Sequence, residues 1–336
     1  ISPSYLDQFK PNTQKTPNFG RTDSAYWARF TLNNQSDLKW YLRINGLLGQ
    51  DVTLHVVNTD GEIITDDITH HLPNYGLYAW SLALPPQENL QFYLRATNGD
   101  AIFSLPIELF PADDFVEQTR VDRDTYVGLV AALFIMAAYN LLSSLFLRDS
   151  SHLVLAVHIF SVFAIIQLNR PVFTSLSFLN NTESHFFTAP NYMAIISLLV
   201  FCRQLLATAV NTPKLDKLLQ LTIIISTALM CVTGWIPQGA FLSQVTIAIA
   251  FPLIIVTSIA RSLQGYRIAH YFLLIFLLVT LIIIPTTMLN IFANSQWQSS
   301  NIYPVGIATL MFLLLLSIIQ AEKVRKWREE NQKATL

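Results

Sequence analysis

The hydrophobic pattern divides the chain into two parts near residue 120. Before that point, apolar residues recur at every second position in short runs, which is typical of strands with one buried face. In the first clear run these positions are Tyr26, Ala28, Phe30 and Leu32. Similar runs cover residues 38–44, 52–58, 77–84, 90–96 and 103–110. The pattern predicts an all-β sandwich, of the jelly-roll type, over residues 1–118.

The second part consists of long apolar stretches. A helix needs about 20 mostly apolar residues to cross roughly 30 Å of hydrocarbon. Such stretches cover residues 124–147, 152–169, 186–208, 217–236, 240–261, 270–291 and 302–321. The sequence therefore predicts a seven-helix transmembrane bundle over residues 119–321, followed by a charged juxtamembrane helix over residues 322–336.

Composition and charge support this division into a multi-domain membrane protein. Apolar residues make up 52% of the chain and charged residues 13%, which is unusual for a soluble protein. Residues 1–120 hold eight Lys and Arg against fourteen Asp and Glu, whereas residues 121–336 hold thirteen against eight. The first part is thus acidic and the second basic.

The positive charges predict the orientation, because short loops rich in Lys and Arg stay in the cytoplasm. One set of loops and the tail hold Arg148, Arg203, Lys214, Lys217, Arg261, Arg267, Lys323, Arg325, Lys326, Arg328 and Lys333. The opposite loops hold Arg170. We expect a cytoplasmic tail and an extracytoplasmic sandwich, which in a bacterium means an inner-membrane protein with a periplasmic domain.

The acidic residues after Asp124 are placed outside the predicted spans. We expect Asp149, Glu183 and Asp216 to lie in loops. Ion-coupled transporters usually need such groups near the membrane midplane, which disfavours a transporter or channel as the alternative function. The polar residues inside the spans are expected to form hydrogen bonds between helices. They are Asn140, His158, Gln167, Asn191, Gln244 and Asn290.

Three predicted strands repeat an aromatic residue and an arginine two positions apart, on the face opposite the apolar set. The pairs are Trp27 with Arg29, Tyr41 with Arg43, and Tyr93 with Arg95. Aromatic rings can pack on a flat ligand, and guanidinium groups can bind a carboxylate or sulfate. The reading that the residues alone favour is ordinary cross-strand pairs that bind nothing, with a ligand-binding face as the alternative.

No other cluster predicts chemistry. Asp66, Asp67, His70 and His71 are metal-ligand types, but their spacing matches no strong signature, and we expect no metal. Nucleotide-binding and nucleophile motifs are absent from the sequence, so no catalytic residues, no cofactor and no nucleic-acid partner are expected. The chain as given is predicted not to be an enzyme.

The charged tail carries a short heptad pattern. Val324, Trp327, Asn331 and Ala334 follow one another at spacings of three, four and three. This pattern predicts the start of a parallel coiled coil, hence a homodimer, through which the last span would signal to the cytoplasm. The alternative is an amphipathic end whose basic residues bind anionic membrane lipids.

Several motifs resemble one known family. The outer part contains YWARFTLNNQSD, VTLHVVNTDGEI and LQFYLRATNGDAIFSLPIELF, and the membrane part contains YNLLSSLFLRDSSH, QGYRIAHYFLL and AEKVRKWREE. They resemble the bacterial seven-transmembrane receptors with diverse intracellular signalling modules, with the second type of extracellular domain. The loop HHLPNYG departs from the family pattern near Asn74 and Tyr75, where the family has an arginine.

The resemblance implies a signalling receptor. Its outer jelly-roll domain would bind a periplasmic ligand, with carbohydrates among the candidates. Its output would be a histidine kinase, a diguanylate cyclase or a phosphatase outside the present chain, in two-component or cyclic-di-GMP signalling. A membrane scaffold without a ligand remains an alternative reading of the residues alone.

Overall fold

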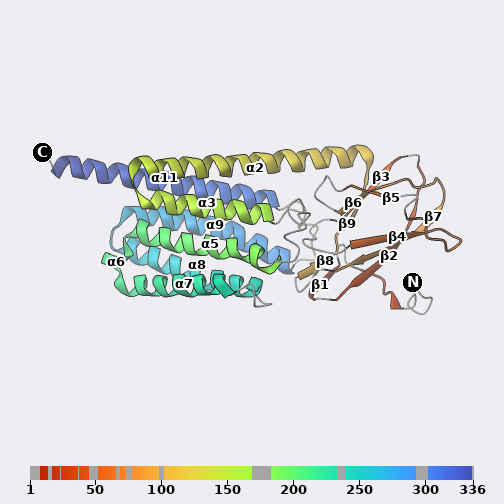
Figure 1. Cartoon of the computed structure of the whole chain (residues 1–336), viewed down its shortest axis with the longest axis horizontal. Helices are drawn as coiled ribbons and strands as arrows, with labels where there is room; N and C mark the ends of the chain where they lie inside the picture. The colour runs from red at the N-terminus through yellow and green to blue at the C-terminus, as the bar shows by residue number, and fades with distance from the viewer. Residues whose placement is uncertain are drawn as a thin grey trace. The chain divides into compact units, whose positions relative to one another are not determined.

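The chain forms two compact units, whose elements are labelled in Figure 1. The first contains Ile1–Thr125, Arg170–Val172 and Thr286–Ile302, and the second contains Tyr126–Asn169, Phe173–Pro285 and Tyr303–Leu336. The structure is a computed structural model. It describes residues 8–13, 17–22, 24–36, 38–44, 52–65, 69–72, 78–97, 102–168, 183–232, 239–292 and 302–334.

The first unit is built from antiparallel strands. They are β1 (Asn18–Arg21), β2 (Tyr26–Asn33), β3 (Trp40–Ile44), β4 (Val52–Val57), β5 (Thr69–His71), β6 (Tyr78–Leu82), β7 (Asn89–Ala96), β8 (Ile102–Ser104) and β9 (Ile107–Pro111). In the described residues they form sheets of order β2-β7-β4 and β5-β6-β3-β9, with a smaller pair β1-β8. The predicted runs fall on β2, β3, β4, β6 and β7, while the run over residues 103–110 is divided between β8 and β9.

The two larger sheets share one apolar core, which makes the unit a sandwich. The core side chains are Leu42, Ile44, Trp80 and Leu82 from β3 and β6, and Leu54, Val56, Leu90, Phe92 and Leu94 from β4 and β7. Along β2, partly buried and exposed residues alternate without interruption, as its sequence pattern predicts. The all-β outer domain is thus confirmed, while the jelly-roll type remains a prediction.

Helix α2 (Ala112–Leu147) begins at the residue after β9 ends. Asp113 and Asp114 lie in its first turn, where negative charge is favoured by the helix dipole. The residues up to Thr125 cluster with the sandwich, and those from Tyr126 with the helices. The predicted domain boundary at residue 118 therefore falls inside one continuous helix.

The second unit is a helical bundle. Its further helices are α3 (Ser150–Leu168), α5 (Glu183–Leu206), α6 (Thr208–Asn211), α7 (Pro213–Val232), α8 (Gly239–Leu263), α9 (Arg267–Phe292) and α11 (Ile302–Ala334). Among described residues, six helices are long and apolar enough to span a membrane, and Arg267–Leu281 of α9 forms a shorter apolar segment. Each predicted crossing falls on a helix of the bundle.

Aromatic contacts join three helices in the bundle core. The Phe272 ring of α9 lies 6.5 Å from Phe201 of α5, and the Phe276 ring lies 6.1 Å from Phe312 of α11. Many apolar side chains on the outer helix faces are exposed, among them Phe146, Leu281 and Ile318. Such exposure is expected where lipid is the solvent.

Two acidic residues that were expected in loops lie in helices. Glu183 is the first residue of α5. Asp216 was expected in a loop, but α7 begins at Pro213, so that Asp216 lies in its first turn and is buried. Proline is favoured at the first position of a helix because its missing N–H group is not needed there. This preference extends α7 toward its N-terminus beyond the apolar stretch.

Candidate functional site

The six predicted site residues lie on two different sheets of the sandwich. Trp27 and Arg29 of β2 are exposed, and β2 pairs with β7 so that Trp27 faces Arg95 and Arg29 faces Tyr93. Tyr41 and Arg43 lie on β3, which belongs to the other sheet. The expectation of one common solvent-side face is therefore wrong for the β3 pair.

The outer face of the β2-β7-β4 sheet combines rings with cations. His55 of β4 faces Tyr93, so the three strands place Arg29, Tyr93 and His55 in one cross-strand row. The Trp27 and His55 rings are stacked with centroids 6.2 Å apart. This arrangement involves more residues than a single cross-strand pair. It forms a continuous patch of rings beside Arg29.

A cleft of about 1060 Å³ opens between β2 and the N-terminal segment. Its described lining is mostly aromatic and apolar, with few polar groups. The lining residues are Gln8, Phe9, Lys10, Pro11, Asn12, Pro17, Phe19, Ala25, Tyr26, Trp27, Ala28, Arg29 and Leu105. A concave, mostly apolar site with a few polar groups is the usual form of a small-molecule site.

Phe9 joins the N-terminal segment to the ring-bearing face. Its ring lies 5.0 Å below the Arg29 guanidinium and meets the Tyr93 ring edge-on at 6.2 Å. Residues 8–12 have no strand or helix periodicity, so no pattern in the sequence predicts this contact. Phe19 likewise stacks on Tyr26 at 3.9 Å.

Arg43 instead connects the sandwich to the start of α2. Its Nε and Nη2 atoms donate to Glu108 Oε2 at 2.9 and 2.7 Å, and Nη1 lies 3.5 Å from Asp122 Oδ2 of α2. The side chain is 3% exposed, and its guanidinium lies 4.6 Å from the Phe110 ring centre. Arg43 is thus covered and paired, and is poorly placed for a ligand.

An aromatic stack supports the same junction. The Tyr41 and Phe115 rings are parallel within 3° with centroids 4.5 Å apart. On α2, Phe115, Thr119 and Asp122 follow one another at helical spacing and are more buried than their neighbours. Phe115 is the apolar member of the three, so hydropathy along α2 does not reveal the face that packs on the sandwich.

Helices α2 and α11 meet directly in the second unit. Asn140 Nδ2 of α2 donates to Ser317 Oγ of α11 at 3.0 Å, and both side chains are buried. Asn140 Oδ1 lies 3.3 Å from His152 Nδ1 of α3. About three turns away, toward the start of α11, a Cβ atom on Gly306 would lie 2.8 Å from Leu129 Cδ2 of α2, so the two helices also approach closely there.

The tail-proximal end of α11 has further polar contacts. Gln320 Nε2 donates to Asp149 Oδ2 at 2.9 Å, and Asp149 Oδ1 also accepts the Ser151 N–H that begins α3. Lys323 Nζ donates to the Gln204 carbonyl at the end of α5, at 2.8 Å. These bonds fix α11 against α3 and α5.

The end of α5 collects donors from three elements. Besides Lys323, the Tyr266 hydroxyl donates to the Leu205 carbonyl at 3.2 Å, and Arg261 Nε donates to the Leu206 carbonyl at 2.7 Å. The last carbonyls of a helix lack partners within the helix. Here they are satisfied by side chains from α8, the α8–α9 turn and α11.

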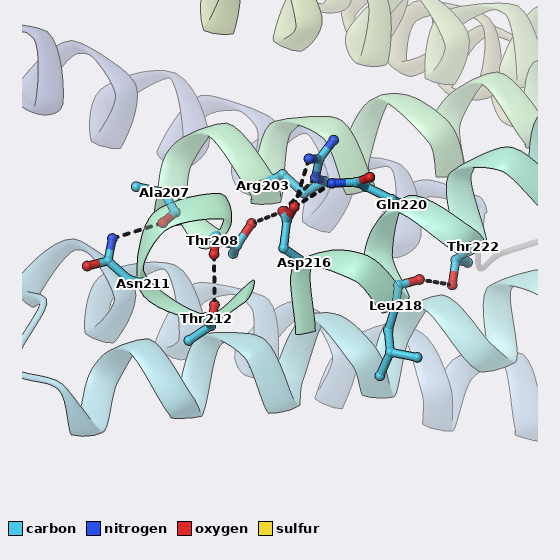
Figure 2. Close-up of polar contacts among 9 residues, drawn as sticks. All are labelled: Arg203, Ala207, Thr208, Asn211, Thr212, Asp216, Leu218, Gln220 and Thr222. Atoms are coloured by element: carbon cyan, nitrogen blue, oxygen red, sulfur yellow. Dashed lines mark hydrogen bonds and ion pairs between the residues drawn. The ribbon is translucent and has the colours of Figure 1, made fainter. Parts of the chain in front are cut away.

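Asp216 is the centre of another polar cluster, which Figure 2 shows. Its carboxylate accepts from Arg203 Nε and Nη2 at 2.7 and 3.0 Å, from Thr208 Oγ1 at 2.5 Å and from Gln220 Nε2 at 2.6 Å. The cluster joins α5, α6 and α7. Because the carboxylate is fully hydrogen-bonded, its role is structural.

Of the polar residues predicted to bond between helices, Asn140, His158 and Gln167 do so, whereas Gln244 of α8 is exposed. Besides Asn140, His158 Nδ1 of α3 lies 3.2 Å from Ser197 Oγ of α5, and the Tyr126 hydroxyl of α2 donates to Gln167 Oε1 of α3. Such bonds stabilise helix association in membranes.

Other predicted residues are only partly described. Val324 is half-buried on α11, whereas the side chains of Trp327 and Asn331 lie outside the described part. Asp66, Asp67, Asn74 and Tyr75 also lie outside the described residues, and His70 and His71 lie on β5. Within the described ranges, no group of three His, Cys, Asp or Glu could hold a metal ion.

Comparison with protein families gives two matches that together cover both units. The model described as 7TM diverse intracellular signalling matches residues 124–322, more than half of the chain. The model described as 7TMR-DISM extracellular 2 matches residues 1–110. A comparison with curated proteins finds no match.

Proposed function

The chain belongs to the family of seven-transmembrane receptors with diverse intracellular signalling modules, and from this premise we propose how its signal passes. It is a transmembrane receptor-type protein with an extracellular sensor domain. In our proposal, a ligand binds the sandwich at the cleft beside β2, and α2 carries the effect to α11. We also propose that the sandwich lies in the periplasm and the end of α11 in the cytoplasm of an inner-membrane protein with seven crossings, which the basic residues of the tail-side loops support.

The observation that carries this proposal is the continuity of α2. The helix starts at Ala112 with no linker after β9, and its first turns are held on β3 and β9 by Arg43 and Phe115. The same helix reaches Asn140, which bonds to Ser317 of α11. A helix rises about 1.5 Å per residue and is stiff over this length. A shift at its start is therefore passed along it.

The output side is the part of α11 beyond Lys323. We propose that α11 continues as a dimeric coiled coil through Val324, Trp327 and Asn331 into an output module outside residues 1–336, such as a histidine kinase or a diguanylate cyclase. Supporting this, α11 runs to Ala334 without a break. A ligand shifts the balance between two arrangements only by its difference in affinity for them.

Breaking α2 between the two contacts tests the proposal without any ligand. We insert four glycines between Arg123 and Asp124, and use Arg43→Ala as the input perturbation in the intact chain in nanodiscs. A spin label at position 321, exposed on α11, reports the output, after Cys202 and Cys231 are replaced. We expect Arg43→Ala to change the label's mobility in the uninterrupted chain and not in the glycine variant, because glycines destabilise the helix.

Four alanines at the same position are the matched control, since alanine keeps the helix intact. The alanine variant should retain the response to Arg43→Ala. A glycine variant that responds as strongly as the alanine variant would show that α2 is not the route.

Asn140 gives a second prediction, on the α2–α11 contact itself. Asn140→Ala removes the bonds to Ser317 and His152, which we expect to cost about 1 kcal/mol of bundle stability and to displace the label at position 321. Leu142→Ala, on the exposed side of α2, should leave the label's spectrum unchanged. Equal spectra for the two variants would remove Asn140 from the transmission route.

A further inference from the structure

We propose that the cleft beside β2 binds a ring-bearing organic anion, with the ligand ring against the aromatic lining and its acid group paired with Arg29 and Lys10. The proposal rests on the receptor function above and adds the chemical class of the ligand. Acidic sugars and aromatic acids share this chemistry. The experiment below distinguishes them.

The lining provides faces for a ring. Trp27 is 41% exposed where it lines the cleft, although a side chain of this size would gain from burial. The stacked pair of Phe19 and Tyr26 lies in the same lining. Flat apolar surfaces of this kind pack well on the faces of ligand rings.

The charge of the lining has the opposite sign to that of its domain. Lys10 and Arg29 are the charged side chains in the described lining, with no carboxylate among the lining residues that the structure describes. Yet residues 1–120 hold fourteen Asp and Glu against eight Lys and Arg. A cleft lined by one sign of charge attracts ligands of the other sign.

The protein already places a ring against this cation. Phe9 lies 5.0 Å from the Arg29 guanidinium and edge-on to Tyr93. The ring holds Arg29 at the side of the cleft while leaving its N–H groups in the guanidinium plane for an acid group. A guanidinium binds a carboxylate or sulfate through two parallel hydrogen bonds, which gives geometric specificity as well as charge.

Pairs of probes that share a ring and differ in charge test the proposal on the intact chain in nanodiscs, by calorimetric titration. The sugar arm compares methyl glucuronide with methyl glucoside, and the aromatic arm compares phenylacetate with phenylacetamide. In at least one arm we expect the acid to bind about tenfold to a hundredfold more tightly than its neutral counterpart, the range of a charge-assisted hydrogen bond. The arm with this preference identifies the source of the anion.

Variants test which residue causes the preference for the acid probe over its neutral counterpart. Arg29→Gln should remove most of the difference between acid and neutral probe, and Arg29→Lys should retain part of it because the charge remains. Lys39→Gln makes the same change in net charge at an exposed residue outside the cleft lining, and should keep the full preference. An unchanged melting temperature for Arg29→Gln establishes that the loss comes from the cleft.

Three results would overturn the proposal: equal affinity for acid and neutral probes, no binding in either arm, or the same effect from Arg29→Gln and Lys39→Gln. None of these results contradicts the receptor function. That function is tested without ligand, by the glycine insertion in α2. Conversely, an insertion that fails to interrupt transmission leaves the probe affinities as they are. The two failures are therefore distinguishable.

Discussion

Replacing Arg43 by Ala is expected to destabilise the outer domain by about 2–4 kcal/mol and to loosen the first turns of α2. The substitution removes both hydrogen bonds that Glu108 Oε2 accepts from Arg43, together with the contact between Arg43 and Asp122. Breaking a buried ion pair by removing one partner is costly, because the remaining charge loses its compensation. Glu108 is 29% exposed, so water recovers part of that loss.

Denaturant unfolding of the sandwich and hydrogen exchange of residues 112–125 measure this effect. In double-mutant cycles, Arg43 should couple more strongly to Glu108 than to Asp122, following the shorter contacts. Arg120→Ala is the matched control, because Arg120 is 67% exposed and its pair with Asp124 is a surface pair. A loss below about 0.5 kcal/mol, as expected for Arg120→Ala, would contradict a joining role for Arg43.

The second large effect is expected from Asp216→Ala, at about 2–3 kcal/mol of bundle stability. The carboxylate accepts bonds from Arg203, Thr208 and Gln220, and its removal leaves these donors without an acceptor at the turn between α5 and α7. Buried groups that lose a charged partner bear most of the desolvation cost. Asp216→Asn should have an intermediate effect, because an amide keeps one acceptor oxygen.

Reversible unfolding in mixed detergent micelles measures the stability of the bundle. Lys217→Ala changes the adjacent exposed residue and should cost little. In the Arg203→Ala background, Asp216→Ala should cost less than in the native chain, since the pair is already broken. Additive losses would mean that the two residues do not act together.

Much of the fold was predictable because the periodicities are strong. The alternation in β2 predicted its buried face, and the apolar stretches predicted the helices of the bundle. Asp216 was misplaced because hydropathy alone starts α7 after its charged residues, whereas Pro213 and the bond to Arg203 start it earlier.

The candidate site was harder to predict, for a physical reason. The alternation along β3 predicts that Tyr41 and Arg43 lie on the face opposite the core. It does not predict what covers that face. The cover is α2, where Phe115, Thr119 and Asp122 are buried or half-buried at helical spacing although two of the three are polar, so hydropathy does not indicate it. Phe9 had no periodic context, so its contact with Arg29 appears only in three dimensions.

The capped end of α5 has a consequence for how α11 can move. A slide of α11 by one helical turn, about 5.4 Å, would withdraw Lys323 from the Gln204 carbonyl and Gln320 from Asp149 together. Intermediate positions would leave these buried groups unbonded, at a cost of about 1–3 kcal/mol each. We therefore expect α11 to occupy discrete positions in the receptor. Increasing ligand should then change the proportion of molecules in each position, with no gradual displacement of α11.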